Sequence, residues 1–136
     1  RYKEWKGKDM PTFKSLFDGV LVDTPCSCSG TWRRNPDLRW TTLENEIPDY
    51  ATLQAQLLAN AAKTVKPNGS LVYSTCSMFV DENINVVNDF LQANKNFKLQ
   101  PFTCPLTQKS TDGTNQIWYW DADCDAMFTA KFVRVN

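Results

Sequence analysis

The fold class of this chain follows from one apolar run, FDGVLVD at residues 17–23. A short and nearly continuous apolar run is typical of a strand buried in a parallel sheet, and the aspartate and the nearby Pro25 mark its carboxyl end. We therefore predict a central strand over residues 19–22. In an open α/β sheet, the residues that follow such a strand lie where ligands bind.

The rest of the chain alternates helical and strand patterns. Residues 48–62 are rich in good helix formers, with Leu53, Leu57 and Ala61 on one face, and Pro67-Asn68-Gly69 should stop this helix. We predict the remaining elements as a strand over residues 70–74, a helix over 81–94, strands over 97–102 and 126–135, and a loop over 103–115. This order predicts an α/β fold with helices on the faces of a mainly parallel sheet.

Length and composition favour a single partial domain. The chain has 136 residues, of which 42% are hydrophobic and 22% are charged, as in ordinary globular sequences. Residues 1–16 are too short and polar to add a complete strand–helix–strand unit, so residues 1–136 should form the C-terminal half of a Rossmann-like domain. No apolar run is long enough to cross a membrane and no signal peptide is evident, so we expect a cytoplasmic protein.

Charge and composition exclude several classes of function. The formal net charge is zero, which gives no general attraction for nucleic acid. The five cysteines are irregularly spaced, which favours reduced thiols over a disulfide framework. The sequence has no histidine, which excludes a papain-like site and leaves carboxylates, thiols, lysines and tyrosines for acid–base chemistry.

Two cysteines follow predicted strands. Cys26 follows the first predicted strand, which Asp23 closes, and Cys76 follows the second. If the two strands are parallel neighbours, their ends lie about 5 Å apart, or about twice that with one strand between them. Two thiols and one carboxylate would then face one crevice.

The other cysteines have simpler interpretations. Cys28 forms a C-x-C pair with Cys26, but the sequence offers no second close pair and no histidine, so the usual zinc patterns are not met and we predict no metal site. Cys104 and Cys124 are expected to be small buried side chains.

Two motifs carry a family resemblance. Residues 23–40 read DTPCSCSGTWRRNPDLRW, and residues 71–77 read LVYSTCS. In this order they resemble the NOL1/NOP2/Sun family of RNA 5-methylcytosine methyltransferases, and the likeness covers residues 17–82 and returns at 125–130. The resemblance implies S-adenosylmethionine as the methyl donor and RNA as the partner, ribosomal RNA first and transfer RNA as the alternative.

The resemblance also implies roles for three residues. It makes Cys76 the nucleophile and Cys26 the residue that helps to release the product. The chemistry agrees, because carbon 5 of cytosine attacks a sulfonium methyl group only after a thiolate has added to carbon 6. Asp23 is our candidate acid at nitrogen 3 if burial keeps it protonated, and Cys26, or a water or hydroxide instead, would later take the proton from carbon 5. The matching aspartate of the family also lies beside the donor, so Asp23 is equally a candidate for donor binding; capping of the next turn is a further alternative.

A basic and aromatic segment follows the first motif. Arg33, Arg34 and Arg39 are interleaved with Trp32 and Trp40. Such a mixture can hold phosphates and stack on unstacked bases, as in single-stranded RNA recognition. The resemblance implies that this segment approaches the target nucleotide, whose cytosine must be unstacked to expose carbon 6. A solvated loop with structural tryptophans is the alternative.

Several features depart from the family pattern. Relatives open this domain with a glycine-containing turn and an acidic residue that hold the donor, whereas the five glycines here are scattered, so we expect the donor-binding N-terminal half to be missing. Residues 5–7 are a candidate remnant of the third strand. Cys28 stands where relatives commonly have glycine, which makes it an alternative base. Residues 81–83 read DEN, which matches the acidic start of the family's next helix, and we interpret them as a charge at the start of a helix.

The sequence therefore predicts an RNA cytosine-5 methyltransferase, with a fragment over residues 1–136 that is inactive by itself and binds the donor weakly. The alternative is an RNA-binding or assembly module that keeps the fold without catalysis. A DNA cytosine methyltransferase is disfavoured, because those enzymes carry a Pro-Cys nucleophile motif without the Thr-Cys-Ser partner.

Overall fold

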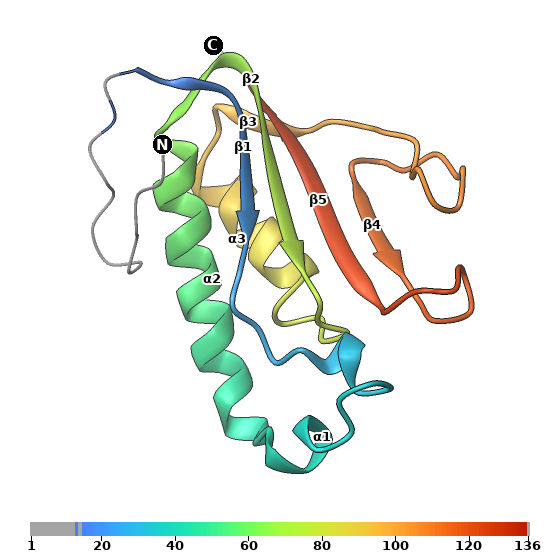
Figure 1. Cartoon of the computed structure of the whole chain (residues 1–136). Helices are drawn as coiled ribbons and strands as arrows, with labels where there is room; N and C mark the ends of the chain where they lie inside the picture. The colour runs from blue at the N-terminus through green and yellow to red at the C-terminus, as the bar shows by residue number, and fades with distance from the viewer. Residues whose placement is uncertain (1–12, 14, 136) are drawn as a thin grey trace.

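The computed structural model describes Phe13 and residues 15–135. The remnant strand predicted at residues 5–7 lies outside the described residues. The sheet is five-stranded and runs in the order β1-β2-β5-β3, with β4 also paired to β5 (Figure 1). The strands are β1 (Phe17–Asp23), β2 (Val65–Thr75), β3 (Phe97–Leu99), β4 (Thr114–Ile117) and β5 (Met127–Arg134). The α-helices are α1 (Leu38–Thr41), α2 (Ile47–Ala62) and α3 (Ile84–Ala93).

The sheet is mixed, so our prediction of a mainly parallel sheet is wrong. Only β1 and β2 pair in parallel, across the helix α2, while β5 is antiparallel to β2, β3 and β4. A parallel pair needs a long crossover, usually a helix, between its strands. No helix of that kind lies between β3 and β5 in the described part of the chain, so the chain turns back on itself and inserts β5 in the opposite direction.

Pro67-Asn68-Gly69, predicted to stop the helix before the second strand, instead form a bulge inside β2. Phe17 pairs with Val65, but Gly19 already pairs with Ser70, so residues 66–69 have no partners in the regular register of β1. Asn68 adopts a φ of 62°, a left-handed conformation that asparagine tolerates better than most residues. Regular pairing therefore starts at Ser70, where the prediction began the strand.

Strand lengths in the C-terminal part also differ from the prediction. β3 is confined to Phe97–Leu99, whereas a strand over residues 97–102 was expected. β4 starts at Thr114, inside the predicted loop over residues 103–115, and its sequence TNQI is too polar and short to give a strand pattern.

One apolar core lies between the sheet and the helices. Buried side chains alternate along β5, and they pack with those of α2 and α3 into a single cluster. Its fully buried members are Leu58, Val65, Leu71, Tyr73, Val87, Ala130 and Phe132. Both longer helices thus cover one face of the sheet. Among the described residues, no helix is long and apolar enough to span a membrane.

Candidate active site

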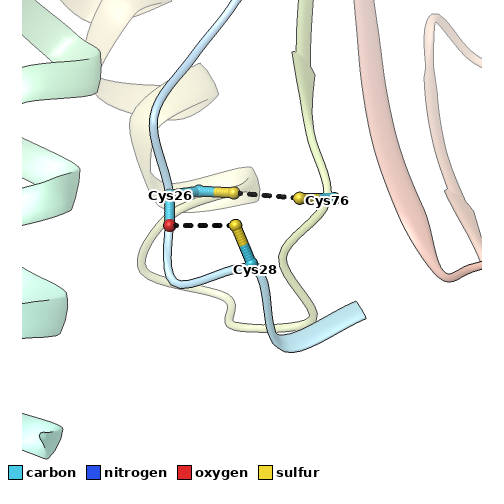
Figure 2. Close-up of side chains that lie close together, drawn as sticks. All are labelled: Cys26, Cys28 and Cys76. Atoms are coloured by element: carbon cyan, nitrogen blue, oxygen red, sulfur yellow. Dashed lines mark hydrogen bonds between the residues drawn. The ribbon is translucent and has the colours of Figure 1, made fainter. Parts of the chain in front are cut away.

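The parallel neighbours β1 and β2 bring the two cysteine motifs to the same end of the sheet. Asp23, the last residue of β1, pairs with Ser74 near the end of β2. Beyond this pair the chain forms a first cysteine loop (residues 24–30) and a second cysteine loop (residues 76–83). The Sγ atoms of Cys26 and Cys76 lie 3.4 Å apart (Figure 2). The structure therefore places both predicted thiols in one site.

Gly30 fastens the first cysteine loop to the second. Its amide donates a hydrogen bond to the carbonyl of Cys76 (2.8 Å), and its carbonyl accepts one from the amide of Ala126 (3.1 Å). A β-carbon at this position would lie 2.1 Å from the carbonyl oxygen of Ala126 and 2.8 Å from that of Cys76. Only glycine allows the two loops and the start of β5 to approach so closely.

A buried carboxylate, Glu82, accepts hydrogen bonds from both cysteine loops. It accepts hydrogen bonds from the amide of Ser27 (2.9 Å) and from the hydroxyls of Ser27 and Ser77 (2.5 Å each). Gln54 of α2 donates a further bond to it (2.9 Å) and one to the carbonyl of Pro25 (2.9 Å). Glu82 is 0% exposed. It therefore fixes the residue that follows each of the two cysteines.

The interpretation of residues 81–83 as a helix-start charge is wrong for Glu82. The helix α3 begins at Ile84 and has no acidic residue in its first turn. Glu82 points instead into the space between the two loops, because three donors there need an acceptor and an unpaired buried donor is costly. The sequence contained one indication of this role: each of the two cysteines is followed by a serine, and two neighbouring serine hydroxyls need a hydrogen-bond acceptor.

Asn83 and Tyr73 extend this buried network. The side-chain amide of Asn83 donates to the carbonyl of Ser77 (2.8 Å), and its oxygen accepts from the hydroxyl of Thr75 (2.6 Å). The hydroxyl of Tyr73 donates to the carbonyl of Glu82 (2.5 Å). The second cysteine loop is thus held to the end of β2 along most of its length.

The contact between the thiols makes them chemically unequal. The hydrogen bond from Cys26 lowers the pKa of Cys76, which is half-buried. The same hydrogen bond, together with burial, raises the pKa of Cys26 well above its ordinary value. Burial also raises the pKa of Cys28. Of the three thiols at this site, Cys76 is therefore the one that loses its proton most readily, and the thiolate is the reactive form.

Asp23 lies near the thiols in sequence but is exposed at the end of the edge strand β1. The burial that our candidate acid role for Asp23 requires is not present among the described residues, and that role stays a prediction. An exposed carboxylate at the carboxyl end of an edge strand can still accept hydrogen bonds from a ligand that lies beyond the sheet. Asp23 is therefore the described residue at this end of β1 that can accept a hydrogen bond from a methyl donor.

The predicted RNA-contacting arginines do not form a free basic patch. Arg34 donates to Asp125 (2.6 Å), and Arg33 lies 3.8 Å from Asp123, so both reach the acidic residues just before β5. Arg39 lies over the ring of Trp40, 5.7 Å from its centroid. All three arginines are exposed.

Trp32 is placed differently from the base-stacking residue we expected. It is half-buried, and its ring meets that of Phe79 edge-to-face at 6.1 Å. Trp32 and Phe79 line a hollow of about 530 Å³ together with residues 42–44, Ile47, Pro48 and Asp81. Trp40 is 80% exposed, so it offers a freer ring for stacking than Trp32.

The fold is that of an α/β methyltransferase. It is similar to the solved structure of NSun6 from Pyrococcus horikoshii, with a TM-score of 0.70 and 25% identity over 85% of this chain and 29% of that one. The chain belongs to the RsmB/F family of 16S rRNA methyltransferases, whose sequence pattern matches residues 1–133. This finding confirms the resemblance to the NOL1/NOP2/Sun family.

Curated relatives of this chain are much longer than the chain itself. Ribosomal RNA small subunit methyltransferase B of Klebsiella pneumoniae is 31% identical over 134 residues, which are 97% of this chain and 28% of that protein. The protein of the same name from Shewanella oneidensis is 38% identical over 132 residues, or 97% and 29%. The chain therefore spans less than a third of the length of these relatives.

Proposed function

We propose that this protein transfers a methyl group from S-adenosylmethionine to carbon 5 of a cytosine in RNA, through a covalent cysteine adduct. Residues 1–136 then form the cysteine-bearing part of the catalytic domain. Ribosomal RNA is the first candidate substrate, because the relatives are named for it, and transfer RNA is the second. The observation that carries the proposal is the 3.4 Å contact between Cys26 and Cys76 at the ends of adjacent parallel strands.

Cys76 begins the reaction as the nucleophile. Its thiolate forms a bond to carbon 6 of the cytosine, and the electrons of the 5,6 double bond move into the ring, which leaves carbon 5 as a nucleophilic enamine carbon. The lowered pKa of Cys76 favours the thiolate that this step needs. S-adenosylmethionine, when bound, supplies a methyl group that its sulfonium sulfur activates toward such a carbon.

Cys26 completes the reaction as the base. It takes the proton from carbon 5, the C–H electrons re-form the 5,6 double bond, and the Cys76 thiolate leaves carbon 6. The hydrogen bond to Cys76 is the first cause of the raised pKa of Cys26. Once the sulfur of Cys76 is bound to carbon, that cause is removed, so Cys26 becomes easier to deprotonate and can serve at the step that requires a base.

The remaining predicted residues have roles in binding. Asp23 is the residue available to the donor, at the open edge beside β1. Arg33, Arg34 and Arg39 contact RNA phosphates, and Trp32 supports the segment that carries them against Phe79. Phosphates compete with the exposed ion pairs of the two paired arginines, which are weak in water.

Separate replacement of the two thiols in the full-length protein tests this proposal. The Cys76→Ala variant should lose methyl transfer, because no thiolate can add to carbon 6. The Cys26→Ala variant should accumulate a covalent protein–RNA adduct, visible as a slow band on a denaturing gel. Cys124→Ala, a thiol outside this site, is the matched control and should transfer methyl groups as the parent does.

Two results would contradict the proposal. Methyl transfer by the Cys76→Ala variant would exclude covalent catalysis at this thiol. RNA binding by the parent protein with no transfer, in the presence of the donor, would instead support a non-catalytic RNA-binding or assembly module.

A further inference from the structure

A third thiol shares the site, and the reaction proposed above leaves it without a role. The side chain of Cys28 points back toward the gap between Cys26 and Cys76, and its Sγ lies 3.5 Å from the carbonyl oxygen of Cys26 (Figure 2). All three sulfur atoms lie within 4.8 Å of one another. Our prediction of no metal site considered only the C-x-C pair, because Cys76 is far from that pair in sequence.

The backbone of Cys28 adopts a conformation that seldom accepts a side chain. Its φ is 55° and its ψ is 23°, in the left-handed region. Glycine takes this conformation without penalty, whereas a residue with a β-carbon is strained in it. Strain of this kind concentrates at functional sites. The conformation also directs the Cys28 thiol at the other two, which a glycine would not supply.

From this geometry we infer that Cys26, Cys28 and Cys76 form a binding site for a thiophilic metal ion, with zinc(II) as its simplest occupant. Zinc–sulfur bonds are about 2.3 Å long, so sulfurs around a tetrahedral zinc ion lie about 3.8 Å apart. The sulfurs of Cys26 and Cys76 are 3.4 Å apart, and all three sulfurs lie within 4.8 Å of one another. Small side-chain rotations therefore suffice to bind the ion.

The surroundings also suit a sulfur-rich site. Cys28 and Cys76 are only partly buried, so an ion and a water as its fourth ligand can reach the three thiols. Thiolates select zinc or copper(I) over harder ions such as magnesium. A disulfide would need only two of the three sulfurs, and would leave the position and conformation of Cys28 without a role.

Metal binding would block the proposed nucleophile. A sulfur lone pair of Cys76 that is bound to zinc is not free to attack carbon 6, so zinc should inhibit methyl transfer. This consequence rests on the proposed function, whereas the binding of the ion does not.

Zinc binding to the purified full-length protein tests the inference. The protein is stripped of metal, kept reduced with a phosphine, and dialysed against Zn²⁺; we expect one ion per chain by metal analysis. Cobalt(II) in place of zinc should give sulfur-to-metal charge-transfer absorption. Cys28→Ser, which keeps a side chain of similar shape, should weaken zinc binding by more than the roughly tenfold that outer-shell changes cause. Cys124→Ser should bind as the parent does, and circular dichroism should show both variants folded.

Three outcomes would overturn the inference. They are no zinc on the parent protein, equal zinc affinity in the parent and the Cys28→Ser variant, and a Cys26–Cys76 disulfide in air without metal binding under reducing conditions. Metal-free protein that fails to methylate RNA would refute the proposed function, and the zinc stoichiometry would be unaffected.

Discussion

The two cysteine loops and the arginine segment (residues 32–40) lie close to each other but are held in different ways. The loops meet over Glu82, which is 0% exposed and accepts hydrogen bonds from Ser27 and Ser77. Charged side chains of the arginine segment are instead held by ion pairs, such as that of Arg34 with Asp125. Buried hydrogen bonds to a carboxylate hold a fixed geometry, whereas exposed ion pairs exchange easily with water and salt.

This difference matches the two tasks that we propose. The thiols need a geometry set to a fraction of an ångström, because one must attack and the other must remove a proton from the same ring. The arginine segment must adapt to an RNA backbone. Substitutions in the two regions can therefore test whether the cysteine loops are rigid and the arginine segment is adaptable.

The largest effect is expected at Glu82. Glu82→Ala leaves the amide of Ser27 and the hydroxyls of Ser27 and Ser77 without their acceptor, so the free energy of unfolding should fall by about 3 kcal/mol. Glu82→Gln keeps the shape and one carbonyl oxygen and should lose less. Urea denaturation measures both, with Asp89→Ala, an exposed acid of α3, as the control. Equal stability of Glu82→Ala and the parent would show that the two loops are not held by this carboxylate.

Gly30→Ala should have the next largest effect. The added methyl group would lie 2.1 Å from the carbonyl oxygen of Ala126, so the loops must move apart, at an expected loss of about 2 kcal/mol. Gly19→Ala is the matched control, since nothing lies within 4 Å of its β-carbon position. Thermal unfolding compares the two variants. A loss of stability at Gly19 as large as that at Gly30 would contradict the close approach described here.

The third effect is a change in the pH dependence of Cys76 alkylation. The hydrogen bond from Cys26 lowers the pKa of Cys76, so Cys76 reacts with iodoacetamide at a lower pH than an ordinary thiol. In Cys26→Ala this donor is absent, the pKa of Cys76 rises, and half-maximal alkylation should move to higher pH. Peptide mass spectrometry follows Cys76 alone, and Cys124→Ala should leave its profile in place. A profile that moves to lower pH would reverse our assignment of the donor.

The smallest effect on stability is expected in the arginine segment. Arg34→Ala removes a surface ion pair, which is worth less than about 1 kcal/mol. The same variant, and Arg39→Ala, should lower the slope of RNA affinity against salt by roughly 0.7 for each phosphate that the variant no longer neutralises. Lys95→Ala, near the end of α3, serves as the control and should keep the parental slope. If the slope of RNA affinity against salt were unchanged in both arginine variants, this segment would not be part of the RNA-binding surface.

Local patterns predicted the elements near the thiols well. The strand β1 and the helix α2 were placed within two residues at each end, because an apolar run and an amphipathic periodicity are clear local patterns, whereas β2 begins five residues before its prediction. The direction of β5 was missed, since strand direction depends on which connections are long enough to cross the sheet. β4 was missed because its four residues have no apolar pattern.

The candidate site was predicted in part. The pairing of Cys26 with Cys76 followed from strand ends that are neighbours, and this contact is present. Asp23 is exposed among the described residues, where β1 has a described neighbour, β2, on one side only, so its role as an acid stays a prediction. Glu82 was misread as a helix-start charge, because one acidic residue before an apolar helix looks the same whether it faces water or the core.

The sequence by itself determined the family and the candidate catalytic residues: two Cys-Ser motifs, each after an apolar strand, in an order that identifies the family. Only the tertiary structure decided how these residues act on one another. It brought Cys28 beside Cys76, placed Glu82 beneath both loops, and paired Arg34 with Asp125. These contacts join residues far apart in the chain, and their geometry depends on the packing of the whole sheet, which local sequence patterns do not encode.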